Sequence, residues 1–134
     1  MPEPSLHHTV FAVDPTRIAR AAEFFTELGF RFAEFELDDV ALRVWLDWDR
    51  GIELVTPSTE DADNPVRQFL DAHGDGVYTL VLRVDDASAA DQLARRYGST
   101  TRFRQHRAGD GWEVDEIDTN TLGLPLTFLT TNLP

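Results

Sequence analysis

Two adjacent histidines open the first β-branched stretch of the chain, in the segment SLHHTVFAVD at residues 5–14. Imidazole has an ordinary pKa close to neutral pH, so either histidine is suited to acid–base chemistry or to metal binding. In an extended strand, neighbouring side chains point to opposite faces of the sheet. His7 and His8 therefore cannot serve the same site.

A carboxylate in a short apolar strand is the second candidate for chemistry. Glu53 lies between Ile52 and Leu54 in the segment GIELVTP. Burying a carboxylate among apolar neighbours is costly unless the charge has a partner. A histidine beside Glu53 would supply that partner, and the two could act together as a general acid and base.

The alternation of apolar residues indicates which face of each strand packs against a helix. Phe11 and Val13 form the bulkier face of the first strand, which predicts that His8 lies on the opposite, helix-free face. The same reasoning places Glu53 on that face. It also assigns four side chains there as lining for a ligand: Arg43, Trp45, Thr79 and Thr127.

Two of these four have an alternative role. Arg43 is suited to binding a carboxylate or phosphate, but it is equally suited to pairing with an acidic neighbour. Trp45 is suited to forming an aromatic wall beside a ligand or to packing in the core.

The elements that must position these residues occur twice along the chain. A β-α-β-β-β pattern covers about residues 5–57 and again about 75–131, and residues 58–74 form a linker with a short helix. We therefore predict an α+β fold in which residues 1–134 form a single domain. In this domain two tandem β-α-β-β-β units form a curved, cup-like mixed sheet with helices on its outer face.

The first helix is expected within the segment DPTRIARAAEFFTELGF. Apolar residues recur there at helical spacing. Asp14 or Thr16 is expected to cap its start, with Pro15 in the first turn, and Gly29 is expected to end it.

The composition limits the classes of function. Asp and Glu number 24 against 12 Lys and Arg, all of which are Arg, so the formal net charge is −12. Such a surface repels nucleic acid and anionic membranes and attracts cationic partners. The sequence has no cysteine and no lysine, which excludes disulfides, thiolate nucleophiles and Schiff-base chemistry. We see no membrane span and no secretory signal, so a cytoplasmic location is expected.

The chain resembles the vicinal oxygen chelate superfamily, which includes glyoxalase I, methylmalonyl-CoA epimerase, extradiol dioxygenases and bleomycin-resistance proteins. The resemblance rests on the paired β-α-β-β-β order over about residues 5–131 and on four segments in sequence: HHTVFAVD, FFTELGF, GIELVTP and GDGVYTLVLRVDD. The last segment is most similar to the epimerase-like and glyoxalase-like branch.

The resemblance also implies a ligand set. In metal-dependent members each unit supplies one ligand from its first strand and one Gln or Glu from its last. The matching positions here are His8, Glu53, Thr79 and Thr127. A neutral hydroxyl is a poor ligand for a divalent cation beside imidazole and carboxylate. We therefore expect no firmly bound cofactor, and at most weak binding of a divalent metal by His8 and Glu53.

Two functions of different classes are consistent with these residues. The first is a small-molecule enzyme of the glyoxalase or epimerase type, a lyase or isomerase. In this hypothesis Glu53 and His8 transfer a proton next to a carbonyl group, and Arg43 is an optional anion clamp. The second is a metal-free protein that binds a cationic drug or metabolite, as resemblance to the bleomycin-resistance proteins implies. Glu113 and Asp115 are candidates to complete the cleft, and together with His106 they are the first candidates for additional metal ligands if the protein holds a full equivalent of metal.

We expect a homodimer, because single-chain members of the superfamily commonly pair and because the edges of open sheets need to be covered. Light scattering at micromolar concentration should give twice the chain mass of 15.1 kDa. A mass near that of one chain would contradict this prediction.

Overall fold

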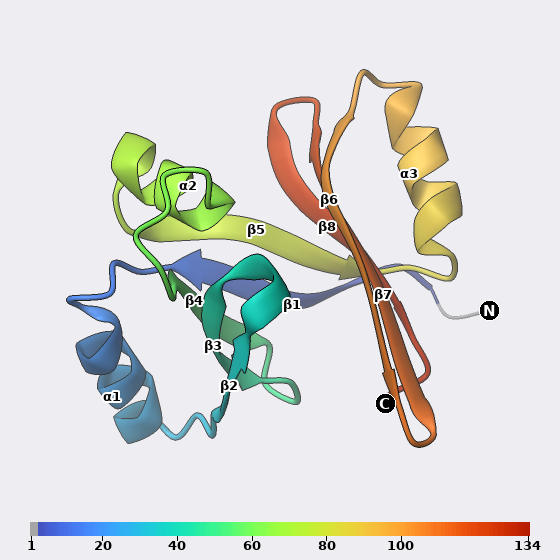
Figure 1. Ribbon diagram of the computed structural model, residues 1–134. Coiled ribbons are helices and arrows are strands. Elements are labelled where there is room, and N and C mark those ends of the chain that lie inside the picture. Colours follow the sequence, from blue (N-terminus) through green and yellow to red (C-terminus); the bar gives the residue numbers. More distant parts are fainter. Residues whose placement is uncertain (1–2) are drawn as a thin grey trace. The chain divides into compact units, whose positions relative to one another are not determined.

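A computed structural model describes residues 3–134 (Figure 1). The first β-α-β-β-β repeat consists of β1 (Ser5–Ala12), α1 (Ile18–Leu28), β2 (Ala33–Leu37), β3 (Leu42–Asp47) and β4 (Ile52–Pro57), with one 3₁₀ turn (Asp38–Val40) before β3. The short helix α2 (Pro65–His73) follows. The second repeat consists of β5 (Gly76–Arg83), α3 (Ala87–Arg95), β6 (Thr100–Gly109), β7 (Trp112–Thr121) and β8 (Leu124–Thr131). The predicted α+β class and the doubled element order are confirmed.

The chain divides into two compact units. The first unit comprises His8–Tyr78, and the second comprises Thr79–Pro134 together with the described residues up to His7. The strand order is β2-β3-β4-β1 in the first repeat and β5-β8-β7-β6 in the second. The first and last strands of each repeat are parallel, and the other neighbours are antiparallel. Each repeat therefore forms a mixed sheet, and the prediction that both belong to a single domain stays a prediction.

Helix α1 packs against one face of the first unit's sheet. Its apolar residues pack against a cluster that contains Val13, which directly follows β1, Trp45 of β3 and Leu54 of β4. The last of these is fully buried. Gly29 ends α1 with φ 113°, a left-handed conformation that glycine adopts at low cost, and its N–H returns to carbonyl groups of the last turn. The predicted end of the helix is confirmed.

The start of α1 differs from the expectation. The helix begins at Ile18, and no side chain caps it. Asp14 instead accepts hydrogen bonds from the backbone N–H and the hydroxyl of Thr16, at 2.9 and 2.7 Å. These hydrogen bonds hold the pKa of the Asp14 carboxyl below its ordinary value, and the bond from the Thr16 backbone has the largest effect. The expected cap was wrong because Asp14 and Thr16 close a separate turn before the helix begins.

Helix α2 lies where the sequence predicts a short helix. Asn64 caps it by accepting hydrogen bonds from the N–H groups of Val66 and Arg67, and Pro65 occupies its first turn, where a missing N–H costs nothing. None of the helices among residues 3–134 has the length and apolar character needed to span a membrane.

The second unit places α3 beside a long hairpin formed by β6 and β7 (Figure 1). Ala87 and Ala94 of α3 pack against Ile117 and Phe128 of the sheet. Asp91 of α3 is almost fully buried, and it accepts hydrogen bonds from Thr101 and Arg104 of β6. A buried carboxylate needs such partners. These contacts define one face of the second unit as the α3 face.

The turn between β3 and β4 is held by a buried carboxylate. Asp47 accepts the backbone N–H of Arg31 at 2.8 Å and that of Arg50 at 3.2 Å, and the Arg50 guanidinium lies 3.3 Å away. Burial opposes ionisation of this carboxyl, but these hydrogen bonds and the arginine charge outweigh burial and lower the pKa of Asp47. The same turn is hydrogen-bonded to β1, because the Gly51 carbonyl accepts a hydrogen bond from the N–H of Thr9 at 3.0 Å.

Replacement of this carboxylate, Asp47→Asn, should lower the free energy of unfolding by about 1–3 kcal/mol at pH 7. Because the folded-state pKa is lowered, the stabilisation is present above the unfolded pKa of about 3.9 and is lost as the pH falls through the folded value. Urea unfolding at a series of pH values should therefore show the difference from wild type shrinking in acid. Asp49→Asn in the same turn is the matched control and should change little. A difference that is constant with pH would contradict this account.

Candidate functional site

His8 and Glu53 lie side by side on the face of the first unit's sheet opposite α1. The strands β1 and β4 are parallel neighbours in a register that pairs Val10 with Glu53. His8 Nε2 lies 3.4 Å from Glu53 Oε1, and the two side chains are 2% and 19% exposed. The predicted juxtaposition of these two residues is confirmed.

The neighbours of this pair on the same face are apolar. Val10 precedes Ala12 along β1, and Val44 lies opposite Val55 across β3 and β4; all four are buried. The Trp48 ring lies 6.1 Å from the imidazole, tilted by 43°. Charge interactions are stronger in such surroundings than in water. A shielded carboxylate beside an imidazole is an arrangement that can accept and return a proton.

The sequence-based assignment of Trp45 to this face was wrong. In the register of β3 and β4, Trp45 lies opposite Leu54. Both belong to the cluster that packs against α1. The residues of β3 that share the face of Glu53 are Val44 and Leu46. Because β3 is apolar on both faces, alternation did not reveal its orientation, and Trp45 is a core residue.

Arg43 shares the face of Trp45 and not that of Glu53. Its guanidinium lies 3.1 Å from the Glu34 carboxylate and 3.7 Å from that of Glu36, and it stacks at 4.9 Å over the Trp45 ring. These contacts match the alternative in which Arg43 pairs with acidic neighbours. The expectation that it clamps an anion beside Glu53 was wrong, because it lies on the opposite face of the sheet.

In the second unit, Thr79 and Thr127 form a buried hydroxyl pair. Their Oγ1 atoms are 2.9 Å apart, and the Thr127 hydroxyl donates to Asp118 Oδ1 at 2.9 Å. Asp118 lies directly across from Thr127 in the register of β7 and β8. Thr79 and Thr127 are 3% and 1% exposed. The two positions therefore lie in contact within one unit, and a carboxylate that we had not singled out completes the group.

The register of β7 explains why Asp118 was missed. Ile117 packs against α3, so Asp118 and Glu116 point to the face opposite α3. Glu113 and Asp115 lie four and two residues before Ile117 along β7, so their side chains point to the same face as Ile117, the α3 face. The alternation around Ile117 contains this signal.

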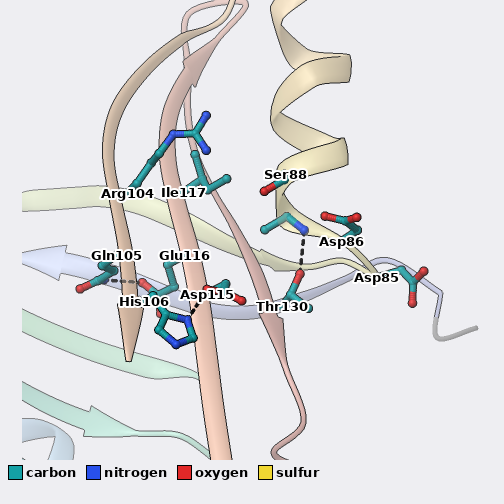
Figure 2. Close-up of a pocket in the computed structure, with 11 residues that line it drawn as sticks. Asp85, Asp86, Ser88, Arg104, Gln105, His106, Asp115, Glu116, Ile117 and Thr130 are labelled. Atoms are coloured by element: carbon teal, nitrogen blue, oxygen red, sulfur yellow. Dashed lines mark hydrogen bonds and ion pairs between the residues drawn. The ribbon is translucent and has the colours of Figure 1, made fainter. Parts of the chain in front are cut away.

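A separate cavity of about 610 Å³ lies in the second unit, where α3 begins beside β6 and β7 (Figure 2). His106 and Asp115, two of the candidates for additional metal ligands, lie on its wall and are hydrogen-bonded to each other at 2.6 Å. Both side chains are about half exposed, and exposed ion pairs contribute little. The Thr130 hydroxyl oxygen accepts a hydrogen bond from the backbone N–H of Ala87 at the start of α3 (Figure 2). The cavity contains none of the residues matched to the superfamily's ligand positions.

The superfamily resemblance implies a divalent metal at the four matched positions, His8, Glu53, Thr79 and Thr127. Within residues 3–134, no group of three or more His, Asp or Glu side chains lies close enough to hold a metal ion. His8 and Glu53 supply two donors, and the hydroxyls of Thr79 and Thr127 are bonded to each other. A divalent cation prefers charged or imidazole donors to neutral hydroxyls. The residues present do not fit a tightly bound divalent metal.

No protein-family model and no curated protein sequence matches the chain. Several solved structures match the chain. A hypothetical protein from Bacillus halodurans C-125 is 19% identical, with a TM-score of 0.75 over 99% of this chain and 98% of that one. Methylmalonyl-CoA epimerase from Mycobacterium tuberculosis is 23% identical, with a TM-score of 0.64 over 93% of this chain and 86% of that one. A single-residue variant of the methylmalonyl-CoA epimerase of Streptomyces coelicolor, in complex with 2-nitronate-propionyl-CoA, is 18% identical, with a TM-score of 0.69 over 96% of this chain and 97% of that one. The chain therefore has the fold of the methylmalonyl-CoA epimerase structures.

Proposed function

We propose that this protein is a small-molecule enzyme of the glyoxalase or epimerase type that transfers a proton at a carbon next to a carbonyl group. The observation that carries the proposal is the shielded pair of His8 and Glu53, with 3.4 Å between Nε2 and Oε1. The fold shared with methylmalonyl-CoA epimerases supports this reaction class over others. Fold alone does not assign chemistry, so the proposal depends on the pair.

Glu53 is the proton acceptor in this proposal. Its side chain is the more exposed of the two and its carboxylate retains an oxygen not needed for His8. That oxygen takes the proton from the carbon, the electron pair of the broken C–H bond moves toward the carbonyl oxygen, and the proton returns to the carbon in the second half of the reaction. General acid–base catalysis of this kind contributes about 10²–10⁴-fold to a rate.

His8 orients Glu53. Its side chain is almost fully buried, and the backbone around it is held by strand pairing and by the bond from Thr9 to Gly51. An imidazole fixed in this way holds one carboxylate oxygen in place and leaves the other for the substrate. Removing the ring should therefore weaken catalysis less than removing the carboxylate.

The proposal includes membership of the vicinal oxygen chelate superfamily and a homodimer in the cytoplasm. The quoted sequence segments and the shared fold support the superfamily. Substrate contact by Thr79 and Thr127 is also proposed, on the basis of their matched positions.

A second candidate function is binding of a cationic drug or metabolite without chemistry. The observation that favours it is the formal net charge of −12, since an acidic protein attracts cations. A ligand that binds only the folded protein raises its melting temperature. Thermal shifts with cationic glycopeptides and with acyl-CoA thioesters therefore separate the two functions: stabilisation by the glycopeptides alone favours binding, and stabilisation by the thioesters favours the enzyme.

Glu53→Gln should strongly slow proton exchange while leaving the fold intact. We expect wild-type protein in D₂O to incorporate deuterium next to the carbonyl of methylmalonyl-CoA or another acyl-CoA thioester, followed by NMR, and the variant to be slower by at least about 10²-fold. Glu36→Gln, an exposed glutamate of β2 paired with Arg43, is the matched control and should keep the wild-type rate. Unchanged exchange in the Glu53 variant would contradict the proposal.

Purified protein should carry well under one equivalent of Zn, Ni, Co, Mn or Fe after dialysis, and added metal should raise the melting temperature little. The double substitution Thr79→His and Thr127→Glu should create measurable metal affinity, because it adds an imidazole and a carboxylate beside Asp118. A full, chelator-resistant equivalent of metal in the native protein would contradict the prediction.

A further inference from the structure

The Trp48 ring lies beside the imidazole of His8, on the face of the first unit's sheet that carries Glu53. The two ring centroids are 6.1 Å apart and the ring planes are tilted by 43°, which is within the range in which aromatic rings interact directly. Trp48 is half-buried and directly follows β3, at the start of the β3–β4 turn. The proposed proton transfer assigns no role to this side chain.

The orientation of the imidazole needs a constraint beyond its contact with Glu53. Rotation of a histidine ring about its Cβ–Cγ bond is broad and roughly two-fold, so two orientations half a turn apart are available to it. Only one of them directs Nε2 toward Glu53 Oε1, at the observed distance of 3.4 Å. Because this distance is longer than that of a typical N–H···O hydrogen bond, the carboxylate holds the ring only weakly.

The turn that carries Trp48 is anchored to the strand that carries His8. Asp47, the residue before Trp48, accepts a hydrogen bond from the N–H of Gly51 through its backbone carbonyl at 2.9 Å. Thr9, the residue after His8, donates its N–H to the Gly51 carbonyl at 3.0 Å. Gly51 therefore holds together the backbone next to the indole and the backbone next to the imidazole.

We propose that Trp48 is a positioning residue that holds the His8 imidazole in the orientation facing Glu53. A broad, flat indole beside the imidazole hinders its rotation, whereas a small side chain would leave room for both orientations. The consequence for catalysis rests on the proposed function, in which His8 holds one oxygen of Glu53 in place. The orientation itself does not, because it is a property of the folded protein without substrate.

The first test is NMR relaxation of protein with ¹³C-labelled histidine rings, without substrate. The His8 signals are identified by their loss in His8→Asn. Wild-type protein should show one set of His8 ring signals with an order parameter near that of rigid backbone, about 0.85. In Trp48→Ala the order parameter should fall below about 0.6, or a second set of signals should appear. Trp48→Phe, which keeps a flat ring, should restore most of the order.

Trp112→Ala is the matched control for this measurement. This tryptophan is also partly exposed, but it lies against Gly109 in the second unit, so its loss should leave the His8 ring unchanged. If Trp48→Ala does not fold, Trp48→Leu keeps apolar bulk without a flat ring and should loosen the imidazole in the same way. A His8 ring as ordered as in wild type, in a folded alanine or leucine variant, would overturn the proposal.

The second test measures deuterium incorporation into an acyl-CoA thioester. Trp48→Ala should lower kcat about tenfold with little change in KM, because a loosened positioning group costs rate and not binding. In a His8→Asn background the same substitution should cause no further loss, because Trp48 acts through His8. Equal losses in both backgrounds would overturn this role in catalysis. If wild-type protein incorporates no deuterium, the proposed function fails, and the NMR result still decides whether Trp48 positions His8.

Discussion

The parallel register of β1 and β4 is the constraint on which the candidate site depends. It pairs Val10 with Glu53 and so sets His8 beside the carboxylate, 3.4 Å away. A shift by one residue would turn either side chain to the α1 face and leave a carboxylate among apolar residues without a partner. The β3–β4 turn supports this register, because Asp47 holds the turn and Gly51 binds Thr9 of β1.

Corresponding positions of the two repeats carry side chains of different chemical character. The first unit holds an imidazole and a carboxylate that can exchange a proton. The second unit holds two hydroxyls 2.9 Å apart, one of which donates a hydrogen bond to Asp118. The neighbours with this fold include methylmalonyl-CoA epimerases, but the second unit's donors are unsuited to a divalent metal. The two repeats therefore share their element order but differ in the side chains at these positions.

The sequence was sufficient for the elements and for the central pair, but not for the whole site. Alternation located His8 and Glu53 because one face of each strand is clearly the more apolar. It failed in β3, where Val44, Trp45 and Leu46 form an unbroken apolar run and neither face is marked. Alternation around Ile117 indicates the face of Asp118, but it does not show that Thr127 on another strand is its partner, because only the cross-strand register brings the two together.

The central claim is that His8 and Glu53 act as one unit in proton transfer. A double-mutant cycle on the rate of deuterium incorporation tests it most directly, with His8→Asn, Glu53→Gln and the double variant measured on one acyl-CoA thioester. Groups that act as a unit are strongly non-additive. The account predicts that the double variant is no slower than Glu53→Gln alone. Losses that multiply, or a His8 variant with the wild-type rate, would contradict it.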